Sequence, residues 1–207
     1  MLHHKALHAL LGDMDIYLLD HLLKGRVHSH FKILDAGCGQ GRNIFYLLRT
    51  GHQVYGFDKD EGAISLLLHQ LGAVDSSYPK ARFVVGDAAA IPFPNASFDF
   101  VISSAVLHFA QDEGHFYAMV DELSRVMQPG AFLFVRMTTT VGMEGKYQSL
   151  ANGKYLLPDG SIRFLFTTDM IADLSKKYGL RLAEPLKTVL VHEQRSMSIL
   201  LFQKNKS

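Results

Sequence analysis

The stretch FKILDAGCGQGRN, residues 31–43, places a short apolar run directly before three closely spaced glycines. An apolar run stopped by glycine is typical of a buried β-strand. Residues 41–51, GRNIFYLLRTG, continue with helix-like spacing and end on a glycine. The stretch therefore predicts a strand, a glycine-rich turn and a helix, the first unit of an α/β fold.

The same alternation continues toward the C-terminus. We expect a strand at 53–58, a helix at 61–72 with Gly72 just past its end, and a third strand at 81–87. A fourth strand at 98–105, a helix at 114–127 and a fifth strand at 131–137 follow. The strand runs are continuously apolar, as in parallel strands buried on both faces, so helices should cover both faces of the sheet.

The two ends of the chain differ from this pattern. Residues 5–24 predict one or two amphipathic helices broken near Gly12. Residues 138–166 lack a clear period and suit a flap or a small hairpin beside a site.

The last segment predicts a helix at 167–180, then strands at 181–194 and 197–204. Their connection is too short for a parallel crossover, so these two strands should pair antiparallel. The expected fold is a Rossmann-like, doubly wound α/β sheet of seven strands, mainly parallel with an antiparallel last strand.

Composition limits the functional classes. With 48% apolar and 20% charged residues, the 207-residue chain has the make-up of a globular protein and not of a disordered one. The net charge of +1 predicts no general affinity for nucleic acid or for anionic membranes. The single Cys38 cannot form an internal disulfide, and no apolar run approaches the roughly 18 residues of a membrane span. A cytoplasmic protein is therefore expected, and both a monomer and a homodimer remain open.

The glycine loop has the spacing G-x-G-x-G, which differs from the G-x-G-x-x-G of dinucleotide sites. Asp35 lies two positions before the first glycine, where a carboxylate would repel a pyrophosphate and suit the cationic amino-acid end of a ligand. Free amides at the helix start would accept polar groups. The alternative is a plain strand-to-helix turn.

Two more acidic residues follow predicted strands. Asp58 ends the second strand and can accept two ribose hydroxyls; the alternative is a helix cap, a role that Asp60 could also fill. Asp87, within Gly86-Asp87-Ala88, can accept from a purine amine, or cap a loop. Together the three strand ends favour an adenosine linked to an amino acid.

Five segments then carry a family resemblance: ILDAGCGQGRN (33–43), VYGFDKD (54–60), FVVGDAAAIPF (83–93), FDFVISSAVLHF (98–109) and VMQPGAFLFVR (126–136). In this order they resemble the successive motifs of class I S-adenosylmethionine-dependent methyltransferases. Residues 37–60 are similar to the tellurite-resistance methyltransferase group and related small bacterial methyltransferases. The resemblance is strong over about residues 30–137 and extends to the end through the antiparallel last strand.

The resemblance implies S-adenosyl-L-methionine as cofactor, with S-adenosyl-L-homocysteine as its product. It implies one domain over 1–207, made of a helical cap (1–28), a cofactor-binding core (30–137), a flap (138–166) and a C-terminal helix with a strand pair (167–207). The implied cofactor contacts run from the methionine end to the adenine, and on to the sulfonium: Asp35, Gly37, Cys38, Gly39, Arg42, Asn43, Asp58, Lys59, Gly86, Asp87, Ala88, Ser103, Ser104 and His108. For Arg42 the alternative is a packing or pairing role on the first helix.

Methyl transfer from a sulfonium is an in-line displacement that needs mainly alignment and desolvation, and a base only for a protonated nucleophile. His108 is the expected base or orienting residue; the alternative is a histidine that caps or packs. Cys38 is expected to be a packed side chain and not an activated thiolate. No metal is expected, since only His4 and His8 have ligand-like spacing.

Tyr17, Tyr147 and Arg195 are the expected contacts to the methyl acceptor. The alternative is that the tyrosines pack in the core and that the arginine is merely solvated. The place after the fourth strand lacks the Asn/Asp-Pro-Pro-aromatic motif of methyltransferases that act on base amino groups. With the near-neutral charge, this favours a small-molecule acceptor and no nucleic-acid or membrane partner. A non-catalytic cofactor-binding or regulatory protein of the same fold is an alternative, and a nicotinamide-dependent oxidoreductase is a less favoured one.

Overall fold

The computed structural model describes residues 3–75 and 77–206. The helices are α1 (His4–Leu11), α2 (Ile16–Leu23), α3 (Ile44–Arg49), α4 (Glu61–Val74), α5 (Glu113–Val126) and α6 (Asp169–Tyr178), with 3-10 turns at Lys80–Arg82, Leu107–Phe109 and Ala151–Gly153. The strands are β1 (Lys32–Ala36), β2 (Gln53–Asp58), β3 (Phe83–Val85), β4 (Phe98–Ser104), β5 (Met127–Thr138), β6 (Gln148–Ser149), β7 (Lys154–Leu156), β8 (Ile162–Phe164), β9 (Leu180–Leu182), β10 (Lys187–Val191) and β11 (Arg195–Lys204). In these residues no helix is long and apolar enough to cross a membrane.

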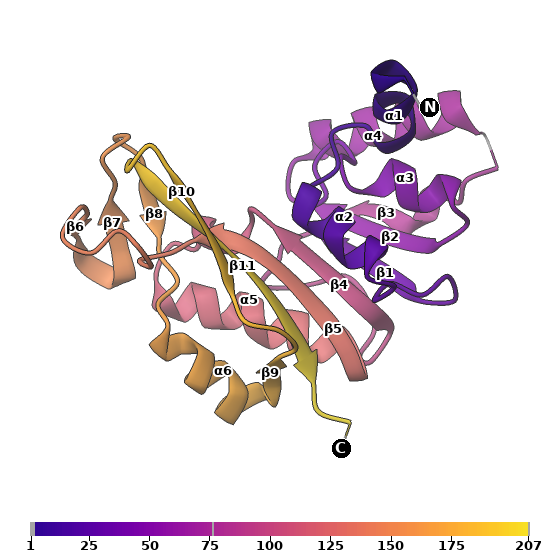
Figure 1. Cartoon of the computed structure of the whole chain (residues 1–207). Helices are drawn as coiled ribbons and strands as arrows, with labels where there is room; N and C mark the ends of the chain where they lie inside the picture. The colour runs from indigo at the N-terminus through magenta and orange to yellow at the C-terminus, as the bar shows by residue number, and fades with distance from the viewer. Residues whose placement is uncertain (1–2, 76, 207) are drawn as a thin grey trace.

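The main sheet has the order β10-β11-β5-β4-β1-β2-β3, with β9 also paired to β11 (Figure 1). Strands β3, β2, β1, β4 and β5 pair in parallel, whereas β11 pairs antiparallel with β5, β9 and β10. The predicted α/β class, the mainly parallel sheet and the antiparallel C-terminal pairing are confirmed.

The predicted number of seven strands is wrong, because the described residues place eight in the main sheet. The expected strand at 181–194 is two strands, β9 and β10, which pair with different parts of β11. Leu180 pairs with Lys204 and Lys187 with Ile199. Pro185 lies between the two strands and has no N–H to donate, which interrupts the ladder there.

The end of α4 also differs from the sequence prediction, since the helix runs through Gly72 to Val74. Gly72 has ordinary helical φ, and a Cβ at this position would lie only 3.2 Å from Nζ of Lys80. The glycine therefore leaves room for the Lys80 side chain and does not end the helix. The amide of Asp75 closes the last turn by donating to Leu71 O.

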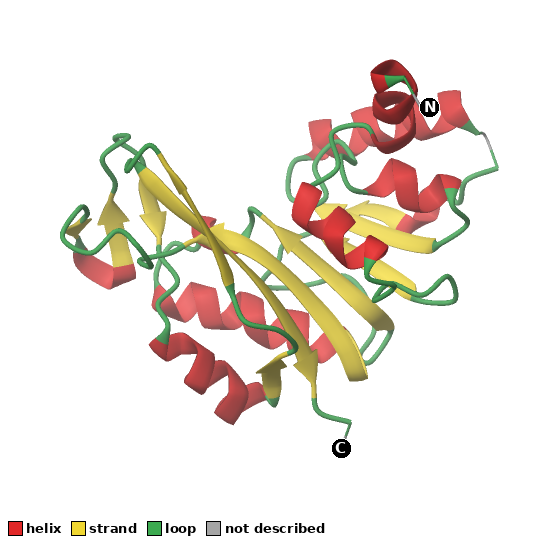
Figure 2. Ribbon diagram, in the orientation of Figure 1, coloured by secondary structure: helices red, strands yellow, loops and turns green. Residues whose placement is uncertain are grey.

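Helices cover both faces of the main sheet, and the core is divided accordingly (Figure 2). On one face, α5 and α6 pack on side chains such as Leu34, Val101 and Leu133. On the other face, α2, α3 and α4 pack on side chains such as Ile33 and Phe134. Neighbouring strand residues thus enter opposite halves of the core, which explains the unbroken apolar runs in the sequence.

Residues 138–166 contain a separate three-stranded antiparallel sheet, β6-β7-β8. Two threonine hydroxyls fasten its end to the main sheet: Thr138 Oγ1 donates to Phe164 O at 3.0 Å, and Thr139 Oγ1 to Phe166 O at 2.9 Å. In Figure 1 this small sheet lies beside the turn between β10 and β11. It therefore borders the carboxyl end of β5.

We predict that Phe134→Ala lowers the free energy of unfolding by about 3–5 kcal/mol, because its fully buried ring on β5 leaves a cavity when removed. Urea denaturation followed by circular dichroism measures the change. The control Leu190→Ala, on an exposed side chain of β10, should change stability by about 0.5 kcal/mol or less. Equal effects of the two substitutions would contradict this view of the core.

Candidate active site

An open cavity lies at the carboxyl ends of β1 to β4. The empty space in and above it, open solvent at its mouth included, is about 630 Å³. The lining residues come from the loops after these strands and from α5: Gly37, Phe57, Asp58, Lys59, Gly86, Asp87, Ala88, Ala105, Val106, Phe109, His115 and Met119. Six of the residues predicted from sequence thus meet in one place: Gly37, Asp58, Lys59, Gly86, Asp87 and Ala88.

The carboxylate of Asp58 connects the end of β2 to the glycine loop. Its Oδ2 accepts from Gly39 N at 2.8 Å, and its Oδ1 accepts from Asp60 N at 2.9 Å. Asp60, not Asp58, caps α4, since its Oδ1 accepts from Gly62 N and Ala63 N. Each Asp58 oxygen keeps a further lone pair that can accept a hydroxyl in the cavity.

The loop after β3 supplies the opposite wall. Asp87 is exposed, and its Oδ1 accepts from Ala89 N at 2.7 Å. Gly86 N donates to Asp58 O at 3.0 Å, which joins this loop to the end of β2. A Cβ at Gly86 would lie 2.8 Å from the Pro92 ring, so glycine is required for the loop to close.

Asp35 lies beneath the glycine loop and does not line the cavity. It is 2% exposed, and its Oδ2 is buried without a hydrogen-bond partner among the described residues. Burial raises the pKa of Asp35 to about 7; the Arg42 charge opposes this shift, and the Asp58 and Asp15 charges add to it. An unpaired buried carboxyl destabilises a folded protein. The free Oδ2 of Asp35 is therefore a candidate acceptor for a polar group of a ligand.

Gly37 and Ala105 have left-handed backbones where β1 and β4 end. Gly37 has φ +72°, and a Cβ there would come within 2.4 Å of Val106 Cγ2. Ala105 has φ 64° although it carries a Cβ, and its amide donates to Arg136 O at 2.8 Å. Both residues line the cavity. Only Ala105 is strained, since glycine adopts a positive φ freely, and such strain is concentrated at functional sites.

Cys38 is buried in the glycine loop, with its Sγ 3.0 Å from the position of a Cβ on Gly56. Burial raises the pKa of the Cys38 thiol, and the charges of Asp35 and Asp58 act in the same direction. A protonated, enclosed thiol is a poor nucleophile. These properties support the prediction of a packed side chain that fills the space over Gly56.

Three predicted cofactor residues, Arg42, Asn43 and Ser104, contact the buried Asp15 and do not line the cavity. Ser104 Oγ donates to Asp15 Oδ2 at 3.1 Å and accepts from Arg42 Nη2 at 3.2 Å. Asn43 Oδ1 accepts from Asp15 N at 3.0 Å. Arg136 Nη1 donates to Asp15 Oδ2 at 2.9 Å.

Asp15 and Arg136 were not predicted as site residues, although Asp15 could have been identified as the N-cap of α2. We call Asp15 and these four contacts the Asp15 cluster. It fastens α2 to the ends of β4 and β5.

His108 lies in the 3-10 turn after β4 and is 6% exposed. Its Nδ1 is buried without a partner among the described residues. Burial lowers the pKa of His108 to about 4, and the charges of Arg163, Arg136 and Arg195 add to the shift. The imidazole is therefore neutral near pH 7. His108 itself does not line the cavity, but its neighbour Phe109 does.

Ser103 is fully buried at the end of β4, on the α5 side, and its Oγ lacks a partner among the described residues. Ser103 does not line the cavity, although its neighbours in the chain, Ala105 and Val106, do.

The three predicted acceptor residues lie on different elements. Tyr17 of α2 has the Arg136 guanidinium 5.7 Å from its ring centroid. Tyr147 packs edge-on against Tyr155 of the small sheet, with centroids 5.1 Å apart. Arg195 begins β11, 4.0 Å from the Asp159 carboxylate. The structure does not bring these three side chains into the described cavity.

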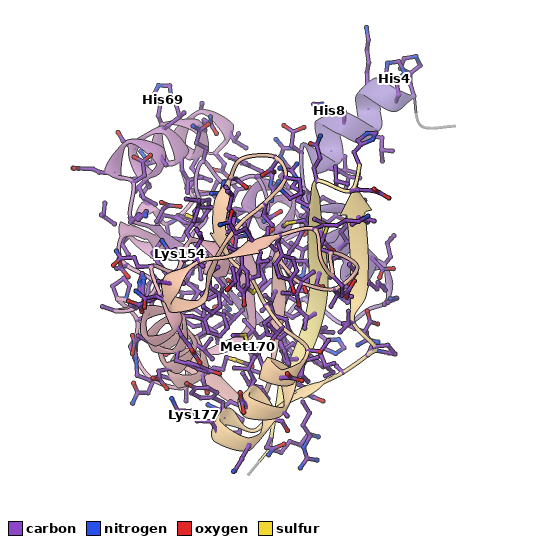
Figure 3. The ribbon with its side chains drawn as sticks, turned by 90° about the vertical axis from the view of Figure 1, so that its left-hand side faces the viewer. His4, His8, His69, Lys154, Met170 and Lys177 are labelled. Atoms are coloured by element: carbon purple, nitrogen blue, oxygen red, sulfur yellow. The ribbon has the colours of Figure 1, made fainter. Side chains whose placement is uncertain are left out.

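Within the described ranges, Asp20, His21 and Glu184 form a group with metal-ligand spacing. Three cations already neutralise the two carboxylates: Lys187 and Lys24 lie 2.8 and 2.6 Å from Asp20, and Arg26 lies 3.0 Å from Glu184. These ion pairs make the group a partly exposed charge network. His4 and His8 lie on α1 at the edge of the molecule (Figure 3), and neither lines the cavity.

The cavity residues that the sequence did not indicate are mostly apolar: Phe57, Ala105, Val106, Phe109, His115 and Met119. Phe57, Ala105, Val106 and Phe109 neighbour predicted residues along the chain, so the positions after β2 and β4 could have suggested them. His115 and Met119 come from α5, whose helical pattern signals core packing and gives no indication of a ligand.

An α/β sheet with a glycine loop and acidic strand ends around one cavity defines a nucleoside-cofactor-binding protein. Comparison with known proteins gives a narrower class. Residues 34–135 match the methyltransferase-domain family. Proteins similar to this chain are S-adenosylmethionine-dependent methyltransferases, and a class I enzyme of this kind, with S-adenosylmethionine as its cofactor, is what the match supports. The narrower likeness to the tellurite-resistance group stays a prediction, because the matched family is broader.

Similar proteins include tRNA N(3)-cytidine methyltransferase METTL2 of Gallus gallus, 28% identical over 163 residues, which are 74% of this chain and 44% of that protein. A S-adenosylmethionine-dependent methyltransferase structure from Methanosarcina mazei has a TM-score of 0.73 and 22% identity, covering 90% of this chain and 98% of that one. A Burkholderia thailandensis 1,6-didemethyltoxoflavin-N1-methyltransferase structure has a TM-score of 0.70 and 17% identity, covering 98% and 83%. This chain spans less than half the length of the curated relatives it matches.

We predict that Asp35→Asn removes a pH dependence of stability. The folded protein holds a proton on Asp35 up to about pH 7, whereas the unfolded chain releases it near the ordinary value of 3.8. In the parent, the stabilisation that comes from protonated Asp35 is fully present below pH 3.8. It is lost as the pH rises toward 7, which lowers the free energy of unfolding by about 4 kcal/mol in total. Relative to the parent, the variant should therefore gain stability as pH rises.

Urea denaturation at about pH 4 and about pH 8 measures this difference. The control Asp13→Asn, with its side chain 84% exposed, should follow the parent. A parent–variant difference that stays constant with pH would contradict the raised pKa.

We predict that His108 titrates near pH 4. Since its folded pKa is lowered from 6.5, the folded state binds fewer protons than the unfolded chain, and stability falls as pH drops from about 6.5 to about 4. Proton NMR of the imidazole, assigned by loss of the signal in His108→Gln, measures the pKa. The same protein unfolded in urea provides the reference near 6.5. A folded pKa above 6 would disprove the buried, cation-flanked environment.

Proposed function

We propose that this protein transfers a methyl group from S-adenosyl-L-methionine to a small-molecule acceptor. The observation that carries the proposal is the meeting of the Asp58 and Asp87 carboxylates with Gly37 in one cavity, above the buried Asp35. The methyltransferase-domain match supports S-adenosyl-L-methionine as the methyl donor. The role of each site residue is inferred from the chemistry of its side chain and its place in the cavity.

The groups around the cavity fit this cofactor. Asp58 can accept two ribose hydroxyls on its free lone pairs while it keeps the bonds from Gly39 and Asp60. Asp87 and the Ala88 amide can pair with the adenine edge. The free Oδ2 of Asp35 is a suitable acceptor for the ammonium end of the amino acid, directly or through water.

When bound, S-adenosyl-L-methionine supplies a methyl group already activated by the sulfonium charge. The protein then has to orient the acceptor and exclude water. Val106 and Phe109 supply apolar walls. The neutral His108, next to Phe109 in the chain, has a buried Nδ1 that lacks a partner among the described residues and would accept the proton of a nucleophile that reaches it. We assign His108 this role of base or orienting residue.

A small acceptor is favoured over a nucleic acid. The net charge of +1 gives no general attraction to a phosphate backbone. The toxoflavin-type neighbour binds a small heterocycle together with S-adenosylhomocysteine, whereas the METTL2 relative acts on tRNA. Incubation of the protein with a labelled methyl donor and either metabolite extract or total tRNA separates the two; label in tRNA alone would overturn the small-molecule assignment.

A cytoplasmic location belongs to the same proposal, because the single Cys38 is a buried free thiol, as is usual in a reducing compartment. The proposed function is compatible with a monomer and with a homodimer. Sedimentation at two protein concentrations distinguishes the two states.

We predict that the parent protein binds S-adenosyl-L-homocysteine and that Asp58→Ala weakens this binding roughly 10- to 100-fold, because charge-assisted bonds to the ribose are lost. Isothermal calorimetry measures the Kd, and thermal shift confirms that the variant is folded. The control Asp75→Ala, at the far end of α4, should bind like the parent.

Lack of binding to the parent would remove the proposed function, and tight NAD binding in its place would favour an oxidoreductase. Parent-like binding by Asp58→Ala would overturn the ribose assignment alone. Binding without label transfer to any acceptor would favour the non-catalytic alternative.

A further inference from the structure

Three arginines from three different elements act on His108. Arg136 belongs to β5, Arg163 to β8 and Arg195 to the start of β11. All the charges that shift the His108 pKa are these cations. The region between the main sheet and the small sheet is therefore electropositive where the acceptor side is expected.

Backbone and ring contacts bring the three elements together. The strand start at Ser196 accepts from Thr139 N at 3.1 Å, which places Arg195 just beyond the end of β5. The Arg163 guanidinium lies over the ring of Phe109, with Cζ 5.1 Å from the centroid. Since Phe109 lines the cofactor cavity, Arg163 lies one side chain away from it.

Nearby carboxylates do not balance these guanidinium groups. Asp15 is shared by Arg136 at 2.9 Å and Arg42 at 3.9 Å. Asp159 is 4.0 Å from Arg195. Arg163 has no carboxylate within 4.0 Å in the described part of the chain. Four guanidinium groups thus face two carboxylates, in a protein whose total charge is only +1.

Two other charged groups of the flap are satisfied locally. Lys146 pairs with Glu193 at 3.0 Å, and Glu144 accepts from Gly142 N at 3.0 Å. Glu144, Lys146 and Glu193 are also exposed, so water screens their charges.

The arginines also have hydrogen-bond donors to spare. Arg136 Nε is buried without a partner among the described residues, and Arg163 Nη1 donates only to the neighbouring Ile162 O. A guanidinium presents five donors in a plane that matches carboxylate and phosphate oxygens. A buried donor without an acceptor is costly, so a ligand oxygen would be favourable here.

We propose that the methyl acceptor carries an oxyanion, a carboxylate or a phosphate, which binds between Arg163, Arg195 and Arg136 beside His108. This inference rests on the proposed methyl-transfer function. The sulfonium donor adds one more positive charge beside an already cationic region. An anionic acceptor balances these charges, whereas a cationic amine would be repelled.

The test is calorimetric titration of the protein, with and without S-adenosyl-L-homocysteine, by three probes of similar shape: benzoate, phenyl phosphate and uncharged benzamide. At least one anion should bind about tenfold more tightly than benzamide, since hydrogen bonds to charged groups contribute more. Benzoate alone would identify a carboxylate site, and phenyl phosphate alone a phosphate site. Raised salt should weaken binding of the anions only.

The double variant Arg163→Gln/Arg195→Gln should lose about tenfold in anion affinity and keep its affinity for S-adenosyl-L-homocysteine. Arg181→Gln is the matched control, because Arg181 is exposed on β9 at the other end of β11. Arg136 is left intact, since its removal would strip the buried Asp15 of a partner.

Three results would overturn the proposal: benzamide binding as tightly as both anions, no anion binding, or unchanged anion affinity in the double variant. Failure of the proposed function is a separate result, because it is the absence of S-adenosyl-L-homocysteine binding to the parent. The titrations without that compound test the oxyanion site independently.

Discussion

The parallel pairing of β1 with β2 on one side and β4 on the other is the constraint on which the rest of the molecule depends. Parallel strands all end at the same edge of a sheet, so the loops after β1, β2, β3 and β4 have to meet there. The helices on both faces make this arrangement possible because they bury strands that are apolar on both sides. The Asp58 carboxylate then fixes two of the loops to each other through the Gly39 amide.

The proposed cofactor half of the site follows from short-range signals, and much of the cavity could be predicted from the sequence. Gly37, Asp58 and Asp87 each lie within a few residues of a strand end, so the periodicity that identifies the strands also places them. The strand count was wrong because the split between β9 and β10 depends on how both pair with one long partner, β11. Likewise, Gly72 looked like a helix end because the room it leaves for Lys80 is invisible in the local sequence.

The proposed acceptor half is different, since its contacts join residues far apart in the chain. Asp15 and Arg136 are separated by 121 residues, and no spacing rule connects them. Arg42 and Asn43 were expected at the cofactor because they follow the glycines, yet their side chains contact Asp15 or Ser104. The two halves also differ in charge. Carboxylates line the part near β1 to β3, and guanidinium groups surround the part near β5, β8 and β11.

The Asp15 cluster also bears on how the chain is made. Arg136 is synthesised 121 residues after its partner Asp15, a delay on the order of ten seconds at ordinary elongation rates. Until then, the core around Leu18 of α2 lacks the part that β5 supplies through Phe134. The Asp15 cluster is therefore complete only after β5 has been synthesised.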